Sequence, residues 1–260
     1  MKIRTAVILC GGKGTRLGNL GKKLPKTLVK VQGKPIIWYI INTLKKYKFN
    51  HFILPLGYKG HKIKKYLKNI FFYNTNIEYV NTGINSNIGK RIYKVKNKIL
   101  SKNFLLLNGD AIFKFNLNKI FLEHEKNNID NTFVSNEFIY PYGTIGTVNG
   151  KITDFKRNLE YNAIKIKNLK YYLAYNYSGI SIMKLTMLNK YCNVFKNTKN
   201  FELSIYPNII KNNKTKLITT FGLWHSIDNI KDLKSVNSPK NDYAKFIKIK
   251  KLKQNLIKND

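Results

Sequence analysis

A glycine-rich stretch close to the start of the chain has the composition of a phosphate-binding turn. It reads ILCGGKGTRL from Ile8 to Leu17, so a short apolar run passes directly into three glycines and an arginine. Beyond the carboxyl end of a parallel strand, such a turn lets backbone N–H groups approach a phosphate that side chains would otherwise block. The string contains neither GxGxxG nor GxxxxGK[ST], so a tight structural turn is the alternative interpretation.

Two cations follow in positions from which they could act on that phosphate. Arg16 stands at the tip of the glycine turn, and Lys26 lies ten residues later in LPKTLV. A guanidinium holds phosphate oxygens in a fork, whereas an ammonium supplies a point charge. In a chain with 48 lysines and arginines, Lys26 alone could be one more surface lysine, but its place after Pro25 favours the functional interpretation.

Carboxylates are scarce, and two of them stand at notable positions. The chain has 13 acidic residues, of which Asp110 ends the apolar run LLLNGD and Asp228 lies in SIDNI. A lone carboxylate at a sheet edge suits a metal ion, and a helix cap is the alternative for Asp110. His225 lies close to Asp228, but we interpret it as a packed or surface histidine. The other histidines indicate no catalytic cluster: His51, His61 and His124.

The strands and helices that must position these side chains are predicted by alternating patterns in the sequence. Continuous apolar runs predict buried strands, and apolar residues at helical spacing predict helices, beginning near Pro35 in GKPIIWYIINTL. The order favours an α/β fold: a Rossmann-like, mixed but mostly parallel sheet with helices on both faces. The predicted strands are 5–10, 51–57, 77–81 and 103–110, and the predicted helices are 33–49, 61–72 and 90–100.

The pattern changes after residue 130. Residues 144–155 predict a hairpin whose turn, Asn149 and Gly150, supplies positive φ angles. We assign residues 1–238 to one domain and residues 239–260 to a basic, amphipathic helical tail with Phe246, Ile249, Leu252 and Leu256 on one stripe. That tail would pack on the core or on a second subunit, with a membrane surface as the less favoured alternative. Further predicted elements are a strand at 178–183, helices at 185–195 and 203–212, and short strands at 216–221 and 223–227.

Composition limits the classes of function. A net charge of +35 could indicate a nucleic-acid partner, but lysine accompanies an excess of asparagine and isoleucine, and all three have A/T-rich codons. Without a nucleic-acid motif, we favour a solvated surface that attracts anionic substrates. The apolar runs are too short for a membrane span or signal peptide, which favours a cytoplasmic protein. Cys10 and Cys192 predict neither a zinc site nor a disulfide scaffold.

The motifs together resemble the sugar-1-phosphate nucleotidyltransferases, also called nucleotide-sugar pyrophosphorylases. GGKGTRL, PKTLV and GKPII stand in that family's order and spacing, and the likeness continues through NGD, YSGISIM and GLWHSIDNIKDL. VNTGINSNIGKRIYKV and LWHSIDNIKD are most similar to the glucose-1-phosphate cytidylyltransferase branch. The resemblance covers most of residues 1–235 and implies a GT-A-like nucleotidyltransferase fold.

The resemblance also implies a reaction and the residues that perform it. A sugar 1-phosphate would attack the α-phosphate of a nucleoside triphosphate in line, giving a nucleotide sugar and pyrophosphate, with Arg16 and Lys26 catalytic and Asp110 and Asp228 holding Mg²⁺. Such nucleotide sugars feed polysaccharide synthesis, and the family leaves room for a homo-oligomer. The implied nucleotide-binding residues are Leu9, Cys10, Gly11, Gly12, Gly14, Thr15, Arg16, Lys26, Thr82, Gly83, Arg91, Asn108 and Gly109. The implied sugar-phosphate-binding residues are Gly143, Tyr177, Ser178, Gly179 and Glu202.

Several positions depart from the family pattern. FKRNL has Arg157 and Asn158 where the family usually has glutamate and lysine, and Tyr177 replaces the asparagine of the sugar-binding turn. NSNIGKR also stands where TMTGGR is expected. CTP and glucose 1-phosphate are therefore the first expectation, and guanylyl or uridylyl transfer to another sugar phosphate is the second. A non-catalytic regulatory homologue and an RNA- or membrane-associated basic protein are the remaining alternatives.

Overall fold

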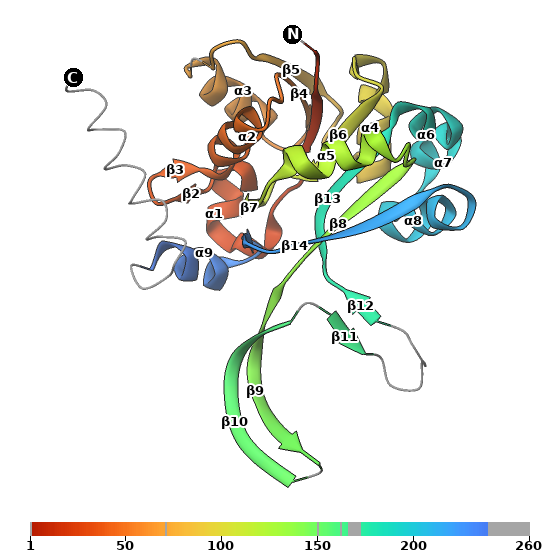
Figure 1. Ribbon diagram of the computed structural model, residues 1–260. Helices are drawn as coiled ribbons and strands as arrows, with labels where there is room; N and C mark the ends of the chain where they lie inside the picture. Colours follow the sequence, from red (N-terminus) through yellow and green to blue (C-terminus); the bar gives the residue numbers. More distant parts are fainter. Residues whose placement is uncertain (1, 71, 150, 162, 166–172, 239–260) are drawn as a thin grey trace, which may run out of the picture.

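The fold is built on a seven-stranded sheet in the order β14-β8-β13-β6-β1-β4-β5. A computed structural model describes residues 2–70, 72–149, 151–161, 163–165 and 173–238 (Figure 1). All neighbouring strands are parallel except β13, which is antiparallel to β6 and β8. The predicted mixed, mostly parallel sheet is confirmed. The strands are β1 (Thr5–Leu9), β4 (His51–Leu56), β5 (Asn76–Asn81), β6 (Asn103–Asn108), β8 (Asn131–Asn136), β13 (Tyr177–Lys184) and β14 (Thr215–Thr220).

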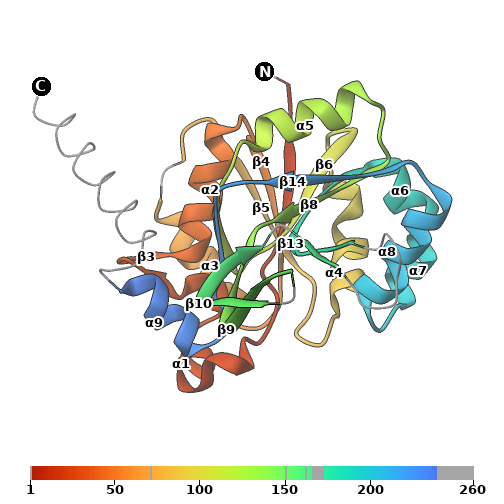
Figure 2. The ribbon, with the colours of Figure 1, turned by 60° about the horizontal axis from the view of Figure 1, so that its bottom comes forward.

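Helices cover both faces of the sheet because alternate residues of each strand point to opposite sides. Ala6 and Ile8 of β1 pack into one apolar cluster, whereas Val7 packs into the other. Figure 2 shows the two helical groups on either side of the sheet. The first cluster includes residues of α2 (Ile36–Lys46), α3 (Gly60–Lys68), α5 (Leu117–Lys126) and α9 (Ile230–Asn237). The second includes residues of α4 (Ile88–Val95), α6 (Leu185–Lys190), α7 (Cys192–Asn197) and α8 (Phe201–Asn212).

Several predicted helices have different limits in the structure. The first, predicted with Pro35 in its first turn, begins at Ile36 after Pro35 as its N-cap, because Lys34–Pro35 forms β3 against β2 (Lys30–Val31), and it ends at Lys46. The helix predicted at 90–100 runs from Ile88 to Val95 and continues as a tighter 3-10 turn. The segment 185–195 is two helices separated at Tyr191, whose φ of −100° and ψ of 19° depart from helical geometry.

Several elements were not predicted from the sequence. The glycine loop continues through the 3-10 turn Thr15–Leu17 into α1 (Gly18–Lys23), and a second 3-10 turn covers Lys26–Leu28. After β6, the strand β7 (Ala111–Lys114) pairs antiparallel with β15 (Leu223–Ser226). The helices α5 and α9 and the strand β8 were also missed, as was the pair β11 (Ala163–Lys165) and β12 (Leu173–Tyr175).

A long hairpin extends from the body of the molecule (Figure 1). Its strands are β9 (Phe138–Val148) and β10 (Lys151–Tyr161), so it is longer at both ends than the predicted 144–155. Asn149 has a φ of 49°, as the predicted turn requires, while Gly150 lies outside the described residues. The predicted tail at 239–260 also lies outside them. Within the described part of the chain, none of the helices has the length and apolar character needed to cross a membrane.

Candidate active site

The glycine loop leaves the sheet where β1 and β6 end side by side. Leu9 and Asn108 are paired at the ends of these strands, and the Gly109 N–H donates to the Leu9 carbonyl at 3.1 Å. A Cβ at Gly109 would lie 2.6 Å from that carbonyl oxygen, so only glycine permits this approach. The carboxyl ends of parallel strands therefore present the loop and the NGD segment at one edge of the sheet.

Arg91 holds the glycine loop in place through its hydrogen bonds. Its side chain is buried, and its guanidinium donates to the carbonyls of Gly11 (3.0 Å), Leu56 (3.3 Å) and Ile84 (3.2 Å) and to the Thr82 hydroxyl (2.6 Å). Burial lowers the pKa of Arg91. The sequence placed Arg91 among nucleotide-binding residues, and in the structure its hydrogen bonds tie the glycine loop to the loop after β5.

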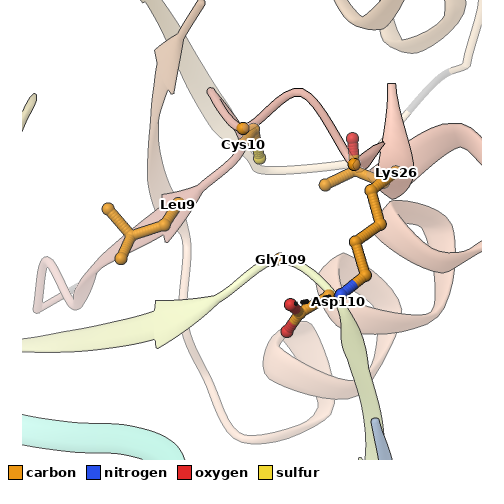
Figure 3. A pocket seen from close by; sticks show the side chains of 8 residues that line it. Leu9, Cys10, Lys26, Gly109 and Asp110 are labelled. Atoms are coloured by element: carbon orange, nitrogen blue, oxygen red, sulfur yellow. Dashed lines mark hydrogen bonds and ion pairs between the residues drawn. The ribbon is translucent and has the colours of Figure 1, made fainter. Parts of the chain in front are cut away.

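Two cations and two carboxylates converge beside the glycine loop. The Lys26 ammonium lies 2.8 Å from Asp110 Oδ2 and 2.8 Å from Asp228 Oδ1. Arg16 Nη2 lies 3.3 Å from the same Asp228 oxygen. In Figure 3 the Lys26 side chain points across the pocket toward Asp110. The four side chains singled out in the sequence, which come from segments up to 212 residues apart, therefore form one cluster.

The local structure holds Asp228 and Asp110 together. The Ile227 N–H donates to the Asp110 carbonyl at 3.0 Å, continuing the pairing of β15 with β7. Asp232 Oδ2 accepts from the N–H groups of Asp228 (2.8 Å) and Asn229 (3.0 Å), and Asn229 caps α9 in return. This capping box fixes the turn that carries Asp228.

The charges of the cluster are matched to one another. Burial by itself would raise the pKa of Asp228, but hydrogen bonds from Lys26 and Ser226 and the nearby Arg16 charge outweigh it and lower that pKa. Asp228 is therefore ionised at neutral pH. Burial raises the pKa of the neighbouring Cys10 thiol, so this thiol is neutral at physiological pH. Cys10 therefore lines the pocket as an uncharged side chain and is not a nucleophile.

The two carboxylates fit a magnesium ion. Mg²⁺ is bound through oxygen ligands and often uses only one or two protein carboxylates together with substrate phosphates. Asp110 and Asp228 share one ammonium in the structure, so the space between them already attracts a cation. Among the described residues no group of three or more His, Cys, Asp or Glu side chains could hold a metal.

Two adjoining pockets lie beside Lys26 and Asp110 of this cluster. The inner pocket is lined by Leu9, Cys10, Gly12, Gly14, Lys26, Thr27, Gly109 and Asp110. The outer pocket, with a volume of about 520 Å³, shares four of these residues and extends to the loop after β5. Its remaining lining residues are Gly11, Lys13, Ile84, Asn85, Ser86, Asn87, Ile88, Arg91 and Asn108. This volume lies in the range of pockets that take small molecules and cofactors.

The pockets separate the predicted nucleotide-binding residues into two groups. Most of them line one pocket or the other, whereas the linings omit Thr15, Arg16, Thr82 and Gly83. Thr82 instead donates to the Leu56 carbonyl at 2.7 Å and accepts from Arg91. The segment from Thr82 to Arg91 was expected to contribute to the nucleotide site, and its run Ile84–Ile88 lines the outer pocket. Lys13 and Thr27 also line the pockets and were not predicted.

The predicted sugar-phosphate residues are absent from the linings of these two pockets, although Gly179 lies next to the lining residue Asn108. The Tyr177 hydroxyl is 2.7 Å from that of Tyr206, and the Ser178 hydroxyl donates to the Val134 carbonyl at 2.7 Å, so both groups already have partners in the protein. Gly179, with a φ of 74°, packs against Asn108. Neither pocket lining contains Gly143 on β9, these three residues, or Glu202 in the exposed first turn of α8. Their assigned role stays a prediction.

Comparisons with known proteins agree on the kind of protein. The family model described as nucleotidyl transferase matches residues 5–156. A probable glucose-1-phosphate cytidylyltransferase of Bacillus subtilis (strain 168) is 28% identical over 252 residues, which cover 89% of this chain and 94% of that protein. A D-glycero-alpha-D-manno-heptose 1-phosphate guanylyltransferase of Aneurinibacillus thermoaerophilus is 32% identical over 154 residues, which cover 58% of this chain and 66% of the relative.

Solved structures share the fold. HddC from Yersinia pseudotuberculosis superimposes with a TM-score of 0.67 at 21% sequence identity, covering 90% of this chain and 98% of its own. Its complex with GMP-PN gives a TM-score of 0.65 at 19% identity, with the same coverage. At these identities the likeness extends to the architecture of the sheet and its helices.

Proposed function

The chain belongs to the nucleotidyl transferase family, and from this premise we propose that it transfers a nucleotidyl group from a nucleoside triphosphate to a sugar 1-phosphate. The observation that carries this proposal is the Lys26 ammonium between Asp110 and Asp228, beside a glycine loop at the carboxyl ends of β1 and β6. The intact cluster argues against a non-catalytic homologue that has kept only the sheet.

The reaction that we propose needs charge compensation more than proton transfer. An oxygen of the sugar phosphate attacks the α-phosphorus, the bond from that phosphorus to the bridging oxygen breaks, and pyrophosphate leaves with the bonding electrons. The second pKa of a phosphate monoester is about 6, so the nucleophile is mostly dianionic at neutral pH and needs no general base. Positioning and fixed cations then supply most of the catalysis.

The residues of the cluster suit these tasks. Lys26, whose side chain is 15% exposed, would place its charge on the α-phosphate, and the exposed Arg16 would hold outer phosphate oxygens. Asp110 and Asp228 would hold Mg²⁺, which when bound neutralises charge on phosphate oxygens. The backbone of the glycine loop would face the phosphates, and the outer pocket would take the base and ribose.

We propose CTP as the nucleotide and glucose 1-phosphate as the first sugar phosphate to test. Support comes from the relative that matches 89% of the chain, which is named a probable glucose-1-phosphate cytidylyltransferase, and from the 80–95 segment, of which Ile84–Ile88 and Arg91 line the outer pocket. A guanylyltransferase relative supports GTP as the second candidate. A nucleotide sugar is an activated glycosyl donor, so a glycosyl transfer reaction would consume the product.

A pyrophosphate-release assay tests this proposal. The protein is incubated with Mg²⁺, each of CTP, GTP, UTP, ATP and dTTP, and a panel of sugar 1-phosphates. We expect turnover with CTP, and turnover only with GTP or UTP would contradict the cytidylyl assignment. Arg16→Ala and Asp110→Asn should each lower kcat by about 10²-fold or more with unchanged circular dichroism. Lys30→Ala, on an exposed lysine of β2, is the matched control. Near-normal rates in the first two variants would refute their roles.

A further inference from the structure

We propose that Lys26 couples metal binding to nucleotide binding: its ion pairs with Asp110 and Asp228 keep a divalent metal weakly bound until triphosphate oxygens draw the ammonium away. This inference rests on the proposed function, because it assumes that the two aspartates hold Mg²⁺. The inference goes further in one respect: the free protein should bind a divalent metal much more tightly when the nucleotide binds with it than when the metal binds alone.

The geometry gives Lys26 the position of a competing cation. Its Nζ lies 2.8 Å from Asp110 Oδ2 and 2.8 Å from Asp228 Oδ1, so one ammonium contacts one oxygen of each carboxylate. A metal that used both of these oxygens would have to replace those contacts. Because the Lys26 side chain is only 15% exposed, solvent screens this competition less than it would at a surface ion pair.

The charge balance of the cluster points the same way. Lys26 and Arg16 contribute two positive charges, and Asp110 and Asp228 contribute two negative ones, so these four described groups sum to zero. A divalent cation alone would add two positive charges to a compensated site. A nucleoside triphosphate brings more negative charge than the metal neutralises, and it offers Lys26 and Arg16 new partners as they leave the carboxylates.

The hydrogen bonds around the cluster hold both aspartates, so Lys26 is the side chain that can move. The Ser226 hydroxyl donates to Asp228 Oδ2 at 2.7 Å, and the capping box of α9 holds the Asp228 backbone. Asp110 is fixed by the backbone bond from Ile227. Arg16 forms an ion pair with Asp228 at the longer distance of 3.3 Å, with a side chain that is 75% exposed. The flexible four-carbon stem of Lys26 can turn toward a phosphate while both carboxylates stay in place.

Direct Mn²⁺ binding, measured by electron paramagnetic resonance in the absence of nucleotide, tests the idea without reference to activity. We expect Lys26→Met to bind Mn²⁺ about tenfold or more tightly than the natural protein, a coupling of the usual size between two sites. Arg16→Met should show a smaller gain, and Lys30→Met should show none. Thermal unfolding of each variant verifies that the fold is intact.

A second measurement addresses the nucleotide half of the coupling. In calorimetric titrations, the natural protein saturated with a non-hydrolysable CTP analogue should bind Mn²⁺ about tenfold or more tightly than the protein without nucleotide. Lys26→Met should show a smaller gain, because its two carboxylates are free for the metal before the nucleotide binds. Equal Mn²⁺ affinity in the natural protein and Lys26→Met would overturn the inference and leave the proposed function standing. If adding Asp110→Asn to Lys26→Met leaves Mn²⁺ binding unchanged, the metal assignment within the proposed function fails instead.

Discussion

At the scale of single residues, Arg16 and Arg91 show how one residue type serves two purposes in the same site. The Arg16 side chain is 75% exposed and contacts a carboxylate, so it is available to a phosphate. The Arg91 guanidinium is buried and donates to three backbone carbonyls and a hydroxyl. Sequence likeness placed both in the nucleotide site, but only the structure separates the exposed Arg16 from the buried Arg91, whose hydrogen bonds hold the glycine loop.

Replacing Arg91 should therefore cost stability as well as function. Arg91→Met removes the four hydrogen bonds of the guanidinium, including those that link the Gly11 and Ile84 carbonyls, and we expect the free energy of unfolding to fall by about 3 kcal/mol. Urea denaturation followed by circular dichroism measures this loss. Lys90→Met, at the exposed neighbouring position, should change stability by less than about 0.5 kcal/mol. Equal stabilities for the two variants would contradict the role of Arg91 as a tie between loops.

The site was partly predictable at this scale because its chemistry is concentrated in short strings. Glycines, a lysine after proline and isolated aspartates stand out in a chain with 13 acidic residues, and the structure brings Lys26, Asp110 and Asp228 together. For the outer pocket the sequence indicated the segment that includes Ile84–Ile88 but not these individual residues, because their types are ordinary. Tyr177 and Ser178 could not be judged from sequence, since their hydroxyls are bonded to groups distant in the chain.

At the scale of elements, the apolar strands and amphipathic helices of the first half were predictable, but β8 was not. Its sequence, NTFVSN, looks like a polar loop, yet Asn131, Thr132, Ser135 and Asn136 are buried between β13 and β14. These residues are buried because β13 and β14, which come from distant parts of the chain, pair with β8 on both sides. The local sequence of β8 contains no pattern that would predict this burial. The helix α5 carried a recognisable signal, because Asn116 caps it and its buried residues repeat at helical spacing.

The contact between α5 and the sheet contains a histidine that should make stability depend on pH. His124 is fully buried, with Nδ1 2.9 Å from the Thr132 hydroxyl and Nε2 3.3 Å from Asn103 Oδ1. Burial, followed by the Lys184 charge, lowers the pKa of His124 to about 4. The unfolded chain binds a proton near pH 6.5 that the folded protein takes up only near pH 4, so stability falls as the pH drops between these values.

We expect this histidine to account for up to about 3 kcal/mol of the acid-dependent loss between pH 6.5 and 4. Urea denaturation at several pH values should show a shallower dependence for His124→Asn than for the natural protein. His61→Asn, at an exposed histidine, should keep the natural slope. Paired carboxylates such as Asp228 lose their contribution at lower pH, so they do not produce the difference within this range. Parallel slopes for all three proteins would refute the prediction.

At the scale of the whole molecule, a chain with a net charge of +35 contains a cluster, Arg16, Lys26, Asp110 and Asp228, whose own four charges cancel. The compensated cluster does not itself attract a distant polyanion, so long-range attraction must come from the many surface lysines. Such attraction acts over about 8 Å at physiological ionic strength and weakens as salt is added. The surface and the cluster should therefore respond differently to salt: the surface governs encounter with the substrates, and the cluster governs the chemical step.

This division predicts a specific salt effect on the kinetics. Raising NaCl from about 50 mM to about 500 mM should lower kcat/KM for the nucleotide severalfold, mainly through KM, because screening weakens the attraction of an anionic substrate. Since Lys26 is only 15% exposed, kcat at saturating substrate should change less. Steady-state kinetics at fixed free Mg²⁺ separates the two effects, with sucrose as a viscosity control. A loss confined to kcat would contradict the division. A basic RNA-associated protein would be favoured instead by two results together: the natural protein shows no nucleotidyl transfer, and Lys26→Ala still binds RNA in a salt-sensitive way.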